Sequence, residues 1–133
     1  MPGAWDATVK DVRAVNAGTD NTLDVIKSGD AFDIVAEVEV GEGILSFGGS
    51  YYRLTVTVRN QSQLTVYPSI VVPRTDLPAS KVKFNQAVRV SFPGGWVAAE
   101  DDVLDVSVSF SLKTGVYTDT TAAVGRTFIV SDE

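Results

Sequence analysis

Two groups of carboxylates are the residues of this chain with the clearest capacity for chemistry. Glu100–Asp102 are consecutive and Asp105 follows closely, while Asp20 and Asp24 lie in a separate turn-rich segment. Calcium takes about six to eight oxygen ligands from converging loops. The spacing from Asp20 to Asp24 lacks the glycine and the terminal glutamate of an EF-hand loop. We therefore interpret both groups as solvated acidic turns and expect no metal site.

Two other catalytic patterns are also excluded by position. Glycoside hydrolysis needs two carboxylates that face each other across the substrate, whereas every Asp and Glu here is expected in a turn or on an outer strand face. The segment 41–49, G-E-G-I-L-S-F-G-G, is rich in glycine. It lies between two predicted strands and lacks the helix that a phosphate-binding loop requires.

Histidine and cysteine are both absent. Histidine is the usual general base near neutral pH and the commonest transition-metal ligand, and cysteine supplies thiolate nucleophiles and disulfides. Ser-His-Asp triads, zinc hydrolase sites and copper sites cannot be built from this chain alone. We therefore expect no enzyme activity and no cofactor.

Aromatic side chains offer a different chemistry, stacking on sugar rings. Trp5, Trp96, Tyr51, Tyr67 and Tyr117 are the candidates, but their spacing does not put three of them on one face. The tryptophan that follows Pro-Gly-Gly is expected to cap the core. A carbohydrate-binding module, with or without a structural calcium, is the alternative function that these residues leave open.

The element that organises the chain is the segment 31–40, A-F-D-I-V-A-E-V-E-V. Phe32 and every second residue after it are apolar, whereas three of the four residues between them are acidic. Successive side chains of a strand point to opposite faces, so this alternation predicts a half-buried strand. The exception on the polar face is Val35.

Six other segments carry strand patterns, and no segment predicts a helix longer than a single turn at 98–102. The first strand has a phase shift that predicts a bulge near Asp11. A proline at position 68 predicts an edge strand. We expect an irregular loop over 73–80 and a turn over 113–121. The six further strands are predicted at 5–15, 51–59, 64–72, 81–92, 103–112 and 124–130.

Regular strands at this spacing predict an all-β fold, a two-sheet antiparallel β-sandwich of about seven strands in one domain over 1–133. The segments 5–15, 31–40 and 81–92 are expected in one sheet, where opposite charges would meet between the second and the third. In alternation and strand number the chain is similar to immunoglobulin and fibronectin type III modules. The two cysteines of antibody domains are missing, and no motif indicates a particular family.

A glycine-rich loop over 41–50 is unusually apolar. It carries Ile44, Leu45 and Phe47 among four glycines. One interpretation is a plug that folds back over the open end of the core. The other is an exposed apolar tip that docks a partner, because exposed apolar patches mark contact sites.

The second sheet is expected to present a surface of small uncharged residues. Such a face is either simply solvated or an association surface, since interface cores are poor in charge. We predict a non-catalytic interaction module that associates with itself or with another protein in a larger assembly. The residues on this face are Tyr51, Thr55, Thr57, Ser107, Ser109 and Ser111.

The overall charge and the chain ends bear on partners and compartment. The net charge is −6, and an acidic chain repels phosphate backbones, so no nucleic-acid partner is expected. No apolar run approaches the roughly 18–20 residues that span a bilayer. The first residues lack the basic and apolar regions of a signal peptide. We expect a cytoplasmic protein if the chain is full length and an exported one if a leader was removed.

Overall fold

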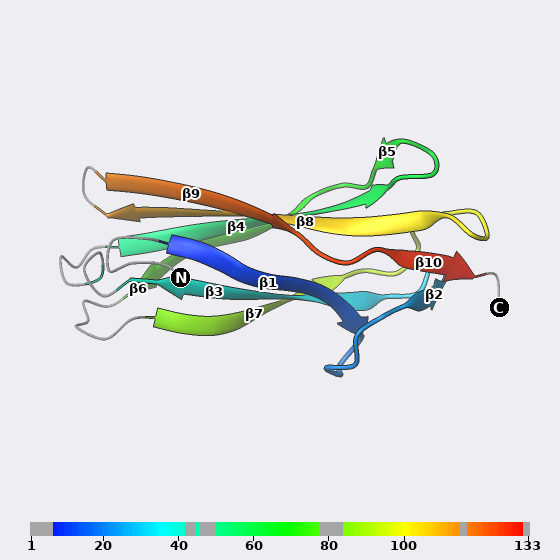
Figure 1. Ribbon diagram of the computed structural model, residues 1–133, viewed down its shortest axis with the longest axis horizontal. Helices are drawn as coiled ribbons and strands as arrows, with labels where there is room; N and C mark the ends of the chain where they lie inside the picture. The colour runs from blue at the N-terminus through cyan, green and yellow to red at the C-terminus, as the bar shows by residue number, and fades with distance from the viewer. Residues whose placement is uncertain (1–6, 42–44, 46–49, 78–83, 115–116, 132–133) are drawn as a thin grey trace.

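The computed structural model describes residues 7–41, 45, 50–77, 84–114 and 117–131, which form ten β-strands joined by turns (Figure 1). The strands are β1 (Ala7–Asn16), β2 (Val25–Lys27), β3 (Phe32–Val40), β4 (Ser50–Asn60), β5 (Thr65–Val66), β6 (Ile70–Leu77), β7 (Phe84–Phe92), β8 (Val103–Thr114), β9 (Tyr117–Val124) and β10 (Phe128–Ser131).

The strands form two sheets that pack face to face. The smaller sheet has the order β1-β3-β7, and the larger has seven strands in the order β2-β10-β8-β4-β5, with β6 added beside β4 and β9 beside β8. All pairs are antiparallel except β2 with β10. Figure 1 shows the two layers along the length of the molecule. The predicted two-sheet antiparallel β-sandwich is confirmed.

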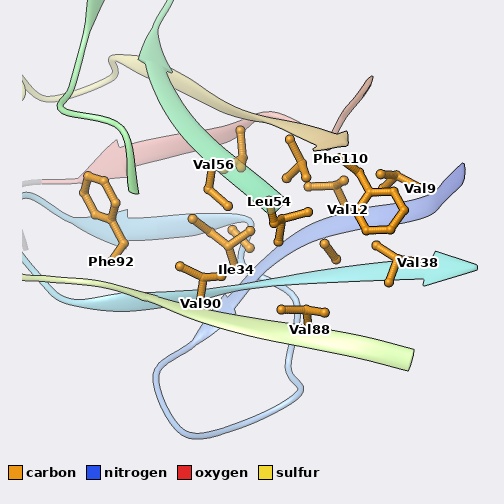
Figure 2. Packing of buried hydrophobic residues seen from close by; sticks show 14 of the residues in the cluster. Val9, Val12, Ile34, Val38, Leu54, Val56, Val88, Val90, Phe92 and Phe110 are labelled. Carbon is orange, nitrogen blue, oxygen red and sulfur yellow. The ribbon is translucent and has the colours of Figure 1, made fainter. Parts of the chain in front are cut away.

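The core lies between the sheets and follows the predicted alternation. Alternate residues of β3 face the larger sheet, and Figure 2 shows Leu54 and Val56 of β4 pointing toward Ile34 of β3 and Val90 of β7. Phe32, at the start of β3, packs against Phe92, Trp96 and Phe128, with ring centroids 4.9, 6.1 and 5.4 Å away. Aromatic contacts of this kind add to the burial of apolar area.

The smaller sheet contains the three predicted strands. The pairing of β1 with β3 shifts between Val9 and Asp11, which confirms the bulge. The antiparallel pairing of β3 with β7 is also confirmed. Arg89 of β7 donates to Asp33 at 2.8 Å and also pairs with Asp20 in the loop after β1. Glu37 of β3 instead approaches an arginine on β1.

One side of the sandwich is closed where β1 lies against β9. The backbone N–H of Ala7 donates to the Asp119 carboxylate at 2.9 Å. Gly125, just after β9, donates its N–H to the carbonyl of Val106 at 2.8 Å. A Cβ added at Gly125 would lie 2.8 Å from the Val12 carbonyl oxygen, so this close approach requires glycine.

Three predicted segments are wrong in detail. In the segment 113–121, which was expected to be a turn, residues 113–114 belong to β8 and residues 117–121 to β9, and the two strands pair antiparallel. Threonine-rich strands suit a pleated surface. The predicted strand over 64–72 is two strands, since it breaks around Pro68, which lacks an N–H. The loop expected over 73–80 is strand as far as Leu77, on the outer edge of β4.

The remaining segments match or refine the predictions. The last strand is β10, and Phe128 and Val130 are buried as predicted. Residues 98–102 form a turn, closed by a hydrogen bond from the Asp102 N–H to the Ala99 carbonyl at 3.1 Å. The part of the chain that the structure describes contains no helix that is long and apolar enough to span a membrane.

Candidate interaction surface

The centre of the predicted face is built by β4 and β8. Their antiparallel register places Thr55 opposite Ser109 and Thr57 opposite Ser107. Directly paired residues of neighbouring strands lie on the same side of a sheet. The strand residues between them are buried valines and leucines, so these four hydroxyl side chains face outward. They lie side by side as the sequence suggested.

The strands β6 and β9 widen this surface on both sides. Val71 of β6 is opposite Thr55, while Ala122 and Val124 of β9 are opposite Ser109 and Ser107. Val71 and Val124 are 53% and 62% exposed. We call this surface the uncharged band, and its members are Thr55, Thr57, Ser69, Val71, Ser107, Ser109, Ala122 and Val124.

Sequence reasoning missed the members on β6 and β9. Most of β9 lies in the segment 113–121, which was expected to be a turn, and residues 118–124 show no alternation of polar and apolar side chains. The signal that favours a strand here is the high strand propensity of threonine and valine. Ser69 precedes β6, and its hydroxyl lies 3.0 Å from the hydroxyl of Thr57. Because the strand breaks at the neighbouring proline, the sequence did not indicate that Ser69 lies beside β4.

Charged residues border the band toward the start of β4. Arg53 is opposite Ser111, and Tyr51 lies between Asp76 on β6 and Lys113 on β8. Two of the six predicted interface residues, Tyr51 and Ser111, therefore lie among charged neighbours. They belong to the border rather than to the uncharged band.

At the other end of β4 the border is an ion pair. Arg59 donates to both carboxylate oxygens of Asp105, at 2.9 and 2.7 Å, and Gln61 donates to the same carboxylate. The bond from Arg59 contributes most to holding the pKa of Asp105 below its usual value, although burial opposes it. Because the two charges neutralise each other, this end of the face carries no net charge.

Asp102 lies in an adjoining polar cluster. Its carboxylate accepts hydrogen bonds from the side chains of Asn60 at 2.9 Å and Gln63 at 2.7 Å, and from the backbone N–H of Ala99 at 2.9 Å. The hydrogen bond from Asn60 contributes most to lowering the pKa of Asp102 below its usual value. The interpretation as a solvated acidic turn is wrong for Asp102 and Asp105, which are both buried.

These buried carboxylates serve the fold. The guanidinium and amide donors to these carboxylates come from segments distant in sequence, and Asp102 also accepts from the nearby backbone N–H of Ala99. Across the described ranges, no group of three or more acidic side chains is arranged to hold a metal ion.

The apolar loop is described at one of its three candidate positions. Leu45 is 2% exposed and belongs to the core cluster, which is the position that the plug interpretation expects. Its backbone N–H donates to the carbonyl of Gly41 at 3.3 Å. Ile44 and Phe47 lie outside the described residues.

The candidate sugar-stacking residues do not form one surface where they are described. Trp96 is buried, as predicted for a residue that caps the core, and its indole N–H donates to the Asp30 carbonyl at 2.8 Å. Tyr67 packs 6.0 Å from this indole, centroid to centroid, and its hydroxyl donates to the Val97 carbonyl at 2.7 Å. Trp5 lies outside the described residues, as does the side chain of Tyr117.

Comparison with known proteins adds no relative. A scan against protein-family models found no match for this chain, and a search among curated proteins found no similar sequence. The function must therefore be inferred from the surfaces that the structure describes. Among these, the uncharged band is both exposed and free of charge.

Proposed function

We propose that this protein is a non-catalytic module that associates with protein, a second copy of itself or another component of an assembly, through the uncharged band. One observation carries the proposal: eight neighbouring side chains without charge span four strands of a protein whose net charge is −6. The cores of protein–protein interfaces are also depleted in charged residues, because burying an unpaired charge is energetically costly.

The size of the band limits the strength of the association. Neighbouring strands lie about 4.8 Å apart, so four strands cover a width of roughly 19 Å, and the two rows give an area on the order of 300 Å². A standard protein–protein interface buries about 800 Å² per partner. Contact through the band alone is therefore weak, and it strengthens if the bordering rows take part or if several copies assemble.

Two features support a binding role rather than catalysis. The chain contains neither histidine nor cysteine, and Asp102 and Asp105 are occupied by structural hydrogen bonds.

The pairing β1-β3-β7 against β6-β4-β8 also supports a relationship to immunoglobulin-like and fibronectin type III sandwiches, many of which bind other proteins. We include this immunoglobulin-like relationship in the proposal.

The test is the solution mass, measured by light scattering over a wide concentration range, of the parent and of Ser109→Glu. Ser109 is exposed at the centre of the band, so a carboxylate there would be desolvated by any partner. The control is Gln86→Glu, which adds the same charge at an exposed position of β7 in the other sheet.

We expect the parent to be larger than a 14.2 kDa monomer at high concentration, and Ser109→Glu to shift it toward the monomer. Gln86→Glu should behave like the parent. Equal masses for the two variants would exclude the band as the self-association surface. A monomeric parent at every concentration would restrict the proposal to association with a different protein.

A further inference from the structure

The hairpin that joins β4 to β5 displays two apolar side chains to solvent. Leu64 is 91% exposed and Val66 is 61% exposed. Leu64 also has φ +56°, a left-handed conformation that is unfavourable for a bulky side chain. Local stability favours neither the exposure of this leucine nor its backbone conformation. Because residues in such conformations concentrate at functional sites, the hairpin is a candidate contact point.

The turn before β8 lies against this hairpin. One carboxylate oxygen of Asp102, in the turn, accepts hydrogen bonds from the side chain of Gln63 at 2.7 Å and from the N–H of Ala99 at 2.9 Å. The N–H of Val103 donates to the hydroxyl of Ser62 at 3.0 Å. Figure 1 shows the hairpin and this turn at the same end of the larger sheet. The two segments therefore form one continuous surface.

The turn adds two acidic side chains to that surface. Glu100 and Asp101 are both exposed, and neither forms an ion pair with any residue that the structure describes. The segments 60–73 and 90–112, which contain the hairpin and the turn, have no lysine or arginine. The negative charge at this end of the sheet is therefore not neutralised by its own segments.

A surface hollow beside Leu64 completes the arrangement. Its volume is about 390 Å³. The charged residue in its wall is Arg59, which is paired with Asp105, so the hollow itself adds no net charge. The wall is formed by Arg59, Asn60, Gln61, Leu64, Thr65 and Val66.

We propose that the hairpin and the turn form a docking site for a basic segment of another protein, in which an apolar side chain is flanked by lysine or arginine. The apolar side chain lies against Leu64 and Val66, and the cations pair with Glu100 and Asp101. Burial of apolar area then supplies the affinity, and the opposite charges supply orientation and specificity. We call these four residues the acidic-apolar site.

Charge decides in favour of this occupant. Nucleic acids and anionic lipid surfaces are negatively charged and are repelled by Glu100 and Asp101. A second copy of the chain would bring the same two acids and a net charge of −6. A basic protein segment is attracted by the acids and can also bury the leucine. The site is separate from the uncharged band and does not depend on it.

The experiment first selects binders from a displayed library of random short peptides against the full chain. The enriched peptides are then synthesised, and their dissociation constants are measured by fluorescence anisotropy. We expect the enriched peptides to carry an excess of lysine and arginine next to an apolar residue, and to bind more weakly as the salt concentration rises. A selection that enriches no peptide, or peptides without this excess, would overturn the proposal.

Two variants then test whether the peptides bind at the acidic-apolar site. Leu64→Gly removes the apolar side chain and suits the left-handed backbone. The second variant combines Glu100→Gln with Asp101→Asn, and asparagine tolerates the left-handed φ of +69° at position 101. The control combines Asp11→Asn with Glu37→Gln, which removes the same charge from the smaller sheet.

We expect the dissociation constant to rise at least tenfold in Leu64→Gly and at least fivefold in the Glu100 and Asp101 variant, and to change little in the control. The thermal midpoint of Leu64→Gly should equal or exceed that of the parent, which separates lost binding from lost folding. Peptides that bind Leu64→Gly as tightly as the parent would overturn the proposal. Equal losses in the two charge variants would do the same, because the attraction would then come from net charge.

Ser109→Glu separates this site from the uncharged band. We expect the basic peptides to bind Ser109→Glu at least as tightly as the parent, and Leu64→Gly to leave the solution mass of the chain unchanged. Peptides that lose affinity in Ser109→Glu and keep it in Leu64→Gly occupy the band, which overturns the acidic-apolar site and leaves the proposed function standing.

Discussion

Arg59 of β4 and Asp105 of β8 are direct cross-strand partners joined by two hydrogen bonds, yet they differ sharply in exposure. The Arg59 side chain is 47% exposed and the Asp105 side chain 1%. The guanidinium keeps contact with water, whereas the carboxylate is almost fully desolvated and depends on its partners. The pair is therefore energetically asymmetric, because a buried charge without its partner is unfavourable.

This asymmetry predicts unequal effects of removing either partner. Arg59→Met leaves the Asp105 carboxylate buried with Gln61 as its other described donor, and we expect the free energy of unfolding to fall by about 1–3 kcal/mol. Asp105→Asn removes the buried charge and keeps nearly the same side-chain shape, so its free energy of unfolding should fall by less than that of Arg59→Met. Urea unfolding at pH 7 measures both. If the two variants lose the same free energy of unfolding, the burial of Asp105 does not make the pair asymmetric.

Stability should depend on pH on the acid side. The pKa of Asp33 is lowered chiefly by the backbone N–H of Gly18 and further by Arg89, and the pKa values of Asp102 and Asp105 are lowered by their partners. In the unfolded chain an aspartate titrates near pKa ~3.9. A folded pKa below this value contributes stability above about pH 4, which is lost as pH falls through the folded values.

We therefore expect the free energy of unfolding to vary little between pH 8 and 5, with no histidine to titrate there, and to fall steeply below about pH 4. Chemical unfolding at a series of pH values measures it. Asp105→Asn should show a shallower decline at acid pH than the parent. An identical decline in the two proteins would mean that Asp105 does not contribute.

Leu45 separates the two interpretations of the 41–50 loop at the position that is described. Because its side chain is buried in the core, Leu45→Ala should lower the free energy of unfolding by about 2–5 kcal/mol. Thermal or urea unfolding measures the loss. A variant with parental stability that no longer associates would instead favour the docking tip.

A side chain at position 125 should clash with β1 at the closed side of the sandwich. Gly125→Ala would place a Cβ 2.8 Å from the Val12 carbonyl oxygen, so β1 or the chain after β9 must shift. We expect a loss of about 1–3 kcal/mol, measured by unfolding. Gly18→Asn is the control, since Gly18 has open space around it and a left-handed backbone that asparagine tolerates. Similar losses in the two variants would argue against the clash.

Much of the fold follows from alternation in the sequence. The period of two in β4 and β8 identifies most of the buried residues, and it placed Thr55 and Ser109 on an outer face before their register was known. In β3 the prediction of a half-buried strand is wrong, because Asp33, Val35 and Glu39 on its other face are buried as well. The bulge near Asp11 follows from a phase shift alone. These features are local, because each residue's face is set by its immediate neighbours in the strand.

The features that sequence reasoning missed depend on distant segments. Nothing near Asp102 indicates that its carboxylate is buried, because its donors Asn60 and Gln63 lie about 40 residues earlier. Likewise, the left-handed backbone of Leu64, with φ +56°, is not one that a leucine side chain favours. Register and burial of this kind are properties of the assembled sandwich rather than of a segment.

The parallel pairing of β10 with β2 has a consequence for synthesis of the chain. Val130 is Cα partner to Ile26, and Phe128 reaches the aromatic cluster around Phe32. About a hundred residues separate these partners, so the nascent chain must have emerged from the ribosome as far as Val130 before this end of the core can close. Until then, the earlier strands of the growing chain lack their last neighbour.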